Sequence, residues 1–407
     1  MSSYRPKNSS RISPEAERLV SDALSLAASG SRVEDIFWEA KLLDRLLRLL
    51  HAQNQNAIES ALDQLLKINP IAFDSLAENA ETLAESLTLE HQGENWDVVL
   101  IAIPIIARTR YSIPSGKLSA ESVAATGNLL HEQIVSQHAR IALVPWLYSI
   151  DQMPHSHCQT RLLLEKLAAA AVNGGEIKLE LRDMPETIPV LADPRYIVGA
   201  VAAPSGGPLF RWQEEAPRRQ ERSVCLQNWQ TGMQATIAAI MPGCEFELTL
   251  PEAYFTNCRE ADRKIRPLSI LAAVKYLESV LSIEPAGLSC VVAGFGEEQC
   301  DEYRIAFAQK GSKEIIYGVV WPLYDRESVP NDGINDISVE DSPIREIYDT
   351  IKAAGIEDQF RHSELFNPEM CEDCGAAMFV DRAGEIVIQV LLKTAGDQHQ
   401  FAYVLYT

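Results

Sequence analysis

The chain has 407 residues, a length typical of roughly two to three domains, and 46% of its residues are hydrophobic. Its 57 Asp and Glu residues outnumber 36 Lys and Arg residues, which gives a formal net charge of −21 at pH 7. Because so acidic a chain repels polyanions, we expect neither nucleic acid nor an anionic membrane surface as its partner.

The N-terminal segment and the cysteines indicate a cytoplasmic protein. Residues 1–12 are rich in Ser and Asn and lack the apolar run of a secretory signal, so we expect a short disordered tail. The most apolar stretch, residues 98–107, is interrupted by Pro104 and falls short of the about 20 residues that a membrane-spanning helix needs. The 8 cysteines are mostly isolated, which is typical of reduced thiols in the cytosol.

Residues 13–90 predict a subdomain made of helices. Ser13 is followed by proline, an N-cap before a first-turn proline, and Ser31 with Glu34 forms a capping box that starts a second helix. Another helix begins at Asn69, which also precedes a proline. The second helix has apolar residues spaced alternately by four and three, which predicts one buried face: Ile36, Ala40, Leu43, Leu47 and Leu50. Short connections between such helices predict a small antiparallel bundle.

Strands and helices alternate from residue 91 onward, which predicts an α/β (or α+β) fold in two lobes. In the first lobe, residues 91–225, we predict strand 97–103, helix 119–137, strand 141–144, helix 159–172 and strand 196–201. In the second lobe, residues 226–407, we predict strand 245–250, helix 268–281, strand 290–293, a hairpin of strands 303–308 and 315–320, helix 344–354 and a C-terminal hairpin after a Cys-x-x-Cys turn.

A short internal echo links the two lobes. Residues 144–148 (Val-Pro-Trp-Leu-Tyr) and residues 320–324 (Val-Trp-Pro-Leu-Tyr) each end a predicted strand and are each followed closely by an aspartate. If the lobes are related, their strand ends face one another, and ligands of α/β folds usually bind in such clefts. The side chains that would then meet at a cleft are Tyr148, Asp151, Tyr324 and Asp325.

Five segments spread along the chain carry a resemblance to a known family: Tyr148 to Gln152, Phe210 to Glu214, Gly294 to Glu297, Val320 to Tyr324, and Cys371 to Gly375. With these segments the chain resembles the bacterial family catalogued as domain of unknown function 2863, along nearly its whole length. The resemblance implies a cytoplasmic bacterial protein. It implies no activity and supplies no catalytic residues.

Basic residues gather in two places, residues 211–222 and residues 259–266. With Trp212 among them, the arginines of the first cluster permit two interpretations: a site for an anion or single-stranded nucleic acid, or a solvated segment whose arginines pair with nearby glutamates. The acidic net charge favours the second interpretation. The other cluster has the same interpretation, since Glu260 and Asp262 are interleaved with its basic residues: Arg259, Arg263, Lys264 and Arg266.

The Cys-x-x-Cys turn predicts half of a structural zinc site. Cys371 and Cys374 are spaced so that two thiolates chelate one ion, and His362 is the only further histidine nearby in sequence. The remaining ligands would come from elsewhere in the fold, with these candidates: His155, His157, Cys158 and Cys300. The alternative is an ordinary hairpin with two reduced thiols. A redox role is disfavoured because Glu372 and Asp373 oppose a thiolate.

Two hypotheses about function remain. The preferred one is a non-catalytic binding or regulatory α/β protein with a structural zinc ion as its only expected cofactor. The alternative is an enzyme of unrecognised class, with its site in a cleft between the two lobes. A structure that places the two echoing strand ends tests the premise of the second hypothesis.

Overall fold

The computed structural model describes residues 12–173, 177, 184–185, 191–297, 299–324, 342–372 and 376–389. The predicted N-terminal tail, apart from Ile12, lies outside these residues. The described part combines helices with three sheets, so the predicted mixed α/β class is confirmed. None of its helices has the length and apolar character needed to cross a bilayer.

The described chain begins with four helices: α1 (Pro14–Ala27), α2 (Arg32–His51), α3 (Gln55–Ile68) and α4 (Pro70–Glu85). The predicted caps are present, because Ser13 accepts a hydrogen bond from the Ala16 amide at 3.2 Å and Ser31 accepts one from Glu34 at 3.3 Å. Asn69 caps α4 in the same way, through the Ala72 amide at 3.1 Å. The four helices share one apolar core, and α6 (His157–Asn173) adds the buried Cys158 to it.

The buried face of α2 differs from the predicted one. Ile36 is 58% exposed, and of the predicted face only Leu50 is buried; the other residues of α2 that enter the core are Leu42, Leu46 and Leu49. This second series has the same four-and-three spacing, and α2 therefore has two apolar stripes. Only the packing of α2 against the other helices selects which stripe is buried.

The first sheet is antiparallel throughout its described pairings. Its strand order is β1 (Ser86–His91), β2 (Glu94–Arg108), β5 (Ala192–Pro204), β4 (Arg140–Tyr148) and β3 (Gly116–Lys117). Beyond β1, the same edge of β2 also pairs with β6 (Glu245–Leu248) and β7 (Glu252–Ala253). The long run 98–107 forms the centre of β2, where both of its faces are covered.

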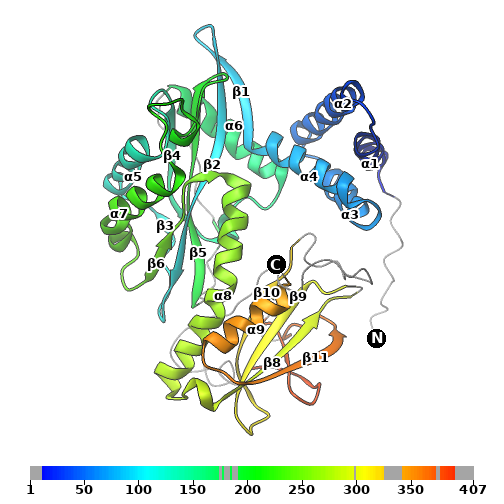
Figure 1. Ribbon diagram of the computed structural model, residues 1–407, viewed down its shortest axis with the longest axis vertical. Coiled ribbons are helices and arrows are strands. Elements are labelled where there is room, and N and C mark those ends of the chain that lie inside the picture. The colour runs from blue at the N-terminus through cyan, green and yellow to red at the C-terminus, as the bar shows by residue number, and fades with distance from the viewer. Residues whose placement is uncertain are drawn as a thin grey trace.

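Helices cover both faces of this sheet (Figure 1). One face packs against α5 (Ala120–Gln133) and α7 (Arg222–Ile240), and the other against α6 (His157–Asn173) and the first half of α8 (Tyr254–Leu281). Short 3-10 turns occur at Ile150–Gln152, Arg211–Gln213 and Pro285–Gly287. The predicted boundary between residues 225 and 226 falls inside α7, because α7, β6, β7 and half of α8 all complete the first sheet.

The second sheet has the order β10 (Ile315–Pro322), β9 (Glu302–Gln309), β8 (Leu288–Phe295) and β11 (Asp358–Phe366). The predicted β9–β10 hairpin is confirmed, and β11 pairs with β8 in parallel. One face packs against α8 and α9 (Pro343–Ala353). The other receives a hairpin of β12 (Phe379–Val380) and β13 (Ile386–Val387), whose Phe379 ring packs so closely that a Cβ at Gly318 would lie 2.2 Å from it.

Helix α8 belongs to both cores. Ala261 and Ile265 pack in the first, whereas Ile270 and Leu277 pack in the second, with Pro267 between the two pairs. Figure 1 shows α8 running from the first sheet to the second. The helix predicted over 268–281 is therefore only its second half.

The two echoing segments occupy different positions in their sheets. Residues 144–148 end β4, which has strands on both sides, whereas β10, which contains residues 320–322, is the edge strand of the second sheet. The strand orders also differ, and the second sheet contains a parallel pair. The described topology does not repeat the first lobe in the second.

Candidate functional site

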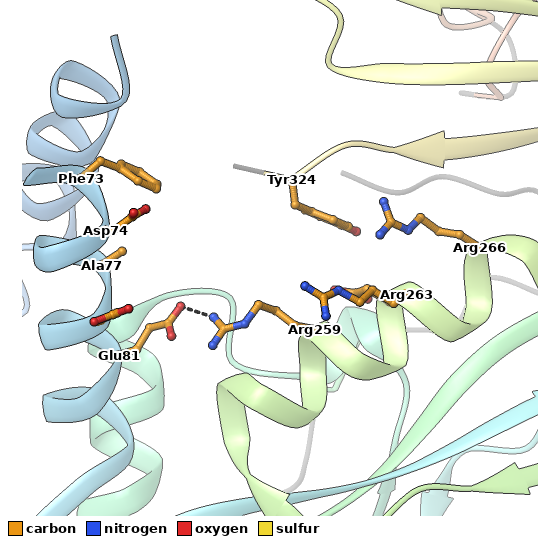
Figure 2. Close-up of a pocket in the computed structure, with 10 residues that line it drawn as sticks. Phe73, Asp74, Ala77, Glu81, Arg259, Arg263, Arg266 and Tyr324 are labelled. Atoms are coloured by element: carbon orange, nitrogen blue, oxygen red, sulfur yellow. Dashed lines mark hydrogen bonds and ion pairs between the residues drawn. The ribbon is translucent and has the colours of Figure 1, made fainter. Parts of the chain in front are cut away.

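A groove between α4 and α8 encloses about 320 Å³. We call it the α4–α8 groove, and it is lined by Phe73, Asp74, Ala77, Glu78, Glu81, Arg259, Asp262, Arg263, Arg266 and Tyr324. Figure 2 shows Phe73, Asp74 and Glu81 projecting from α4 toward Tyr324 and the arginines of α8. One wall is therefore acidic and the other is largely basic.

The basic wall is a consequence of helical spacing. Arg259, Arg263 and Arg266 follow one another at intervals of four and three, so one face of α8 presents all three guanidinium groups. Arg259 bridges the groove to Glu81, with 2.5 Å between Nη1 and Oε1. The buried Arg266 donates to the carbonyl of Pro322 at 3.1 Å. These contacts hold two of the three arginines in place.

Two charged side chains of the groove have no ionic partner in the part of the chain that the structure describes. Arg263 is exposed on the α8 wall, and Glu78 is exposed on the α4 wall. In this region Arg259 pairs with Glu81, and Lys264 pairs with Glu247. The groove thus presents one uncompensated cation and one uncompensated anion on opposite walls.

Two aromatic rings complete the groove. Phe73 comes from α4 and is 7% exposed, whereas Tyr324 follows β10 and is 39% exposed. The centroid of the Tyr324 ring lies 5.7 Å from the Arg266 guanidinium carbon, which is within the range of a cation–π contact. A planar or apolar group entering the groove therefore meets one buried ring and one accessible ring.

A second hollow, of about 460 Å³, lies beside the groove and shares Arg259 and Arg263 with it. Its other cations are neutralised, because Lys264 pairs with Glu247 at 2.5 Å and Arg222 pairs with Glu252. Lys264 also lies 4.0 Å from the interleaved Glu260, as predicted for the 259–266 cluster, whereas the partner of Arg259 is Glu81 of α4.

Glu85, at the end of α4, holds the beginning of α8. Its Oε2 accepts a hydrogen bond from the Phe255 amide at 2.9 Å, in the first turn of the helix, where a carboxylate is favourable. Burial nevertheless raises the pKa of the Glu85 carboxyl to about 7. Glu85 does not line the groove, and its described role is to join the two helices that form it.

The structure separates the residues that the echo predicted to meet. Tyr148 is 3% exposed in the core of the first sheet, where burial raises the pKa of its phenol. Asp151 lies in the 3-10 turn after β4. Of the set, only Tyr324 lines the α4–α8 groove, and Asp325 lies outside the described residues.

The predicted zinc ligands are only partly described. Cys371 is half-buried and Cys374 lies outside the described residues. Nε2 of His362 lies 2.7 Å from the carbonyl oxygen of Asp381, to which it donates in the matching tautomer. Within the described residues there is no group of three or more His, Cys, Asp and Glu arranged around a common point. Zinc binding stays a prediction.

Two of the candidate further ligands have other roles. Burial lowers the pKa of His157 to about 4, and its Nδ1 lies 3.3 Å from Nε2 of Gln55. Cys158 packs in the core of the helical subdomain, where burial raises the pKa of its thiol. Both residues therefore join α6 to the N-terminal helices.

The groove residues come from segments about 180 to 250 positions apart, so the groove depends on the fold of nearly the whole chain. The sequence profile described as "Protein of unknown function (DUF2863)" matches residues 4–400. The chain belongs to this family. The DUF2863 chain matches no curated protein and no solved structure. The family assignment predicted from the five segments is therefore confirmed.

Proposed function

We propose that this DUF2863 protein is a non-catalytic binding protein whose α4–α8 groove holds a small zwitterionic ligand. The observation that carries the proposal is the pair of uncompensated charges, Arg263 on one wall and Glu78 on the other. A ligand with an anionic and a cationic group satisfies both charges at once. A purely anionic ligand would meet the carboxylates of α4, and a purely cationic one would meet the arginines of α8.

The size and lining of the groove narrow the ligand class. A volume of about 320 Å³ lies near the lower end of the range for small-molecule sites, roughly 300–1,000 Å³. Phe73 and Tyr324 add aromatic surface, which favours a ligand with a planar apolar group. An amino acid or dipeptide with an aromatic side chain combines these properties. Its carboxylate would contact Arg263, because a guanidinium donates two parallel hydrogen bonds to the two oxygens of a carboxylate. Its ammonium would contact Glu78.

The chemistry of the lining supports binding. Its guanidinium, carboxylate and aromatic groups are those that recognise charged ligands, and the Arg259–Glu81 and Arg266–Pro322 contacts hold the α8 wall in position. The proposal includes a cytoplasmic location, which six cysteines that form no disulfide bond support: Cys158, Cys225, Cys244, Cys258, Cys290 and Cys300.

Calorimetric titration with L-phenylalanine and two analogues tests the proposal. Phenethylamine lacks the carboxylate and 3-phenylpropanoate lacks the ammonium, so both should bind more weakly than phenylalanine. Removing one charge-assisted contact should weaken phenylalanine binding about tenfold in Arg263→Gln and in Glu78→Gln. Neither variant should weaken binding of the analogue that lacks the matching charge: Arg263→Gln should not weaken phenethylamine binding, and Glu78→Gln should not weaken 3-phenylpropanoate binding.

The matched control is Arg219→Gln, which removes an exposed arginine outside the groove. It should bind phenylalanine as the unaltered protein does. Equal affinity of the groove variants and the unaltered protein would overturn the proposal, as would the absence of binding at millimolar phenylalanine. Conversion of a bound ligand into product would replace binding by catalysis.

A further inference from the structure

A larger cavity, of about 680 Å³, lies at the far side of α8 from the α4–α8 groove. We call it the Arg110 cavity. It lies where the second half of α8 passes the ends of β2 and β6, between the two sheets. Its floor is apolar and consists of Leu191, Leu271, Ala272, Val274, Pro285 and Ala354. Its size and its apolar floor are typical of a small-molecule site.

The loop that borders the cavity is held in a defined position. Thr109, directly after β2, donates its hydroxyl to the carbonyl of Gly243 at 2.9 Å and accepts the Tyr111 amide at 3.2 Å. Gly243 has a φ of +77°, a conformation that residues with a Cβ rarely adopt. These bonds fix the segment before β6 against the segment after β2, so the rim does not depend on an unsupported loop.

The charges on the rim are compensated except at one place. Arg108 pairs with Glu245, with 2.9 Å between Nε and Oε2, and Lys275 pairs with Glu278 at 2.7 Å. Arg110 makes no ion pair with any residue that the structure describes. Its guanidinium carbon lies 5.2 Å from the centroid of the Tyr111 ring. The rim therefore offers one cation to an external anion.

The Tyr111 ring itself is 63% exposed beside this cation. A tyrosine so exposed leaves apolar surface in contact with water, and a ligand that covers it gains the free energy of that burial. An apolar floor with a cation at its edge calls for a ligand with an apolar body and an anionic end.

We propose that the Arg110 cavity binds a monocarboxylate with an apolar body, a site independent of the zwitterion groove. The carboxylate accepts hydrogen bonds from the Arg110 guanidinium, and the apolar body lies on the floor, which α8 forms together with Leu191, Pro285 and Ala354. The apolar end of the ligand enters the cavity first, and its carboxylate stays at the rim beside Arg110. The acidic residues of the rim, Glu245 and Glu278, already pair with Arg108 and Lys275 and so leave Arg110 as the cation for the carboxylate.

Titration of the full chain with octanoate, laurate and lauryl alcohol tests this inference, at concentrations below micelle formation. One equivalent of laurate should bind, and each added methylene between octanoate and laurate should tighten binding by up to about fourfold. Lauryl alcohol should bind about tenfold more weakly than laurate, because it lacks the charge that Arg110 recognises.

Arg110→Gln should weaken laurate binding about tenfold and leave lauryl alcohol binding unchanged. Arg219→Gln, which makes the same charge change at an exposed residue outside the cavity lining, should bind laurate normally. Arg110 is exposed, so its variant should fold, which its melting temperature verifies. The inference is overturned if laurate does not bind, if several equivalents bind with equal affinity, or if Arg110→Gln leaves laurate affinity unchanged.

Discussion

Replacement of Glu85 by glutamine should make the protein more stable above neutral pH and leave its stability in mild acid nearly unchanged. The pKa of this carboxyl is raised from its usual 4.5 to about 7, chiefly by burial and to a smaller extent by the charge of the neighbouring Glu81. The hydrogen bond from Phe255 and the charge of Arg259 act in the opposite direction. Because burial dominates, the folded protein binds this proton more tightly than the unfolded chain does.

The sign of the pH dependence follows from that difference. The contribution of Glu85 to stability is most favourable below pH 4.5, decreases as the pH rises from 4.5 to about 7, and is constant above that. At about 1.4 kcal/mol for each pH unit between the two values, the ionised carboxylate costs the folded state up to about 3 kcal/mol. The glutamine side chain of the variant does not ionise, and its amide oxygen can still accept a hydrogen bond from the Phe255 amide.

Urea unfolding at a series of pH values between 5 and 8, followed by circular dichroism, measures this effect. The stability difference between Glu85→Gln and the unaltered protein should grow by up to about 3 kcal/mol over this range. Glu78→Gln, an exposed carboxylate on the same helix, is the matched control. If Glu85→Gln is less stable than the unaltered protein at pH 8, the bond between the carboxylate and the start of α8 outweighs burial, and the reasoning is wrong.

Three further predictions concern packing and metal binding. Gly318→Ala should destabilise the protein by about 1–3 kcal/mol in urea unfolding, because its Cβ would lie 2.2 Å from the Phe379 ring; Gly127→Ala, with its nearest contact at 3.9 Å, should not. Asp22→Ala should lower the melting temperature, since the buried Asp22 carboxylate joins α1 to Arg45 of α2 at 2.7 Å; an unchanged value would contradict this. Elemental analysis of untagged protein should find about one zinc per chain, lost when serines replace both cysteines of the Cys-x-x-Cys turn; far less zinc in the unaltered protein would make the prediction wrong.

Local signals predicted most of the elements. Helix starts at Ser13, Ser31 and Asn69 were predictable because capping is a contact between residues two or three apart. The central strands were predictable because strands covered on both faces are continuously apolar. Strand β11 was not, since it is an edge strand with mostly polar, exposed side chains that lacks such a run.

The first half of α8 shows a different limit. Its charged stretch from Arg259 to Arg266 indicates a solvated surface, yet the same turns bury Ala261 and Ile265 against the first sheet. In a helix with a narrow buried stripe and a wide charged face, the apolar residues show only a weak periodicity in the sequence. Its core contacts are therefore recognised only when the position of the sheet that it covers is known.

Of the groove residues, the sequence singled out Tyr324 and three members of a basic cluster that it interpreted as ion-paired: Arg259, Arg263 and Arg266. Glu78 and Arg263 are candidate ligand-binding residues because neither has an ionic partner among the described residues. Whether a charged side chain has such a partner depends on which distant side chains the fold brings near it. The echo that drew attention to Tyr324 also indicated Tyr148, which the first core buries. The similarity of two short segments does not determine whether their side chains face solvent or a core.

The sharing of α8 between two cores sets an order for folding during synthesis. The face of β2 and β5 that packs against Ala261 and Ile265 stays uncovered until the ribosome has released those residues. A nascent chain that ends before Tyr254 thus exposes an apolar sheet surface of the kind that chaperones bind. Once α8 has emerged, its first half covers this face of the first sheet. Its second half, with Ile270 and Leu277, stays exposed until β8, β9 and β10 have been synthesised and pack against it.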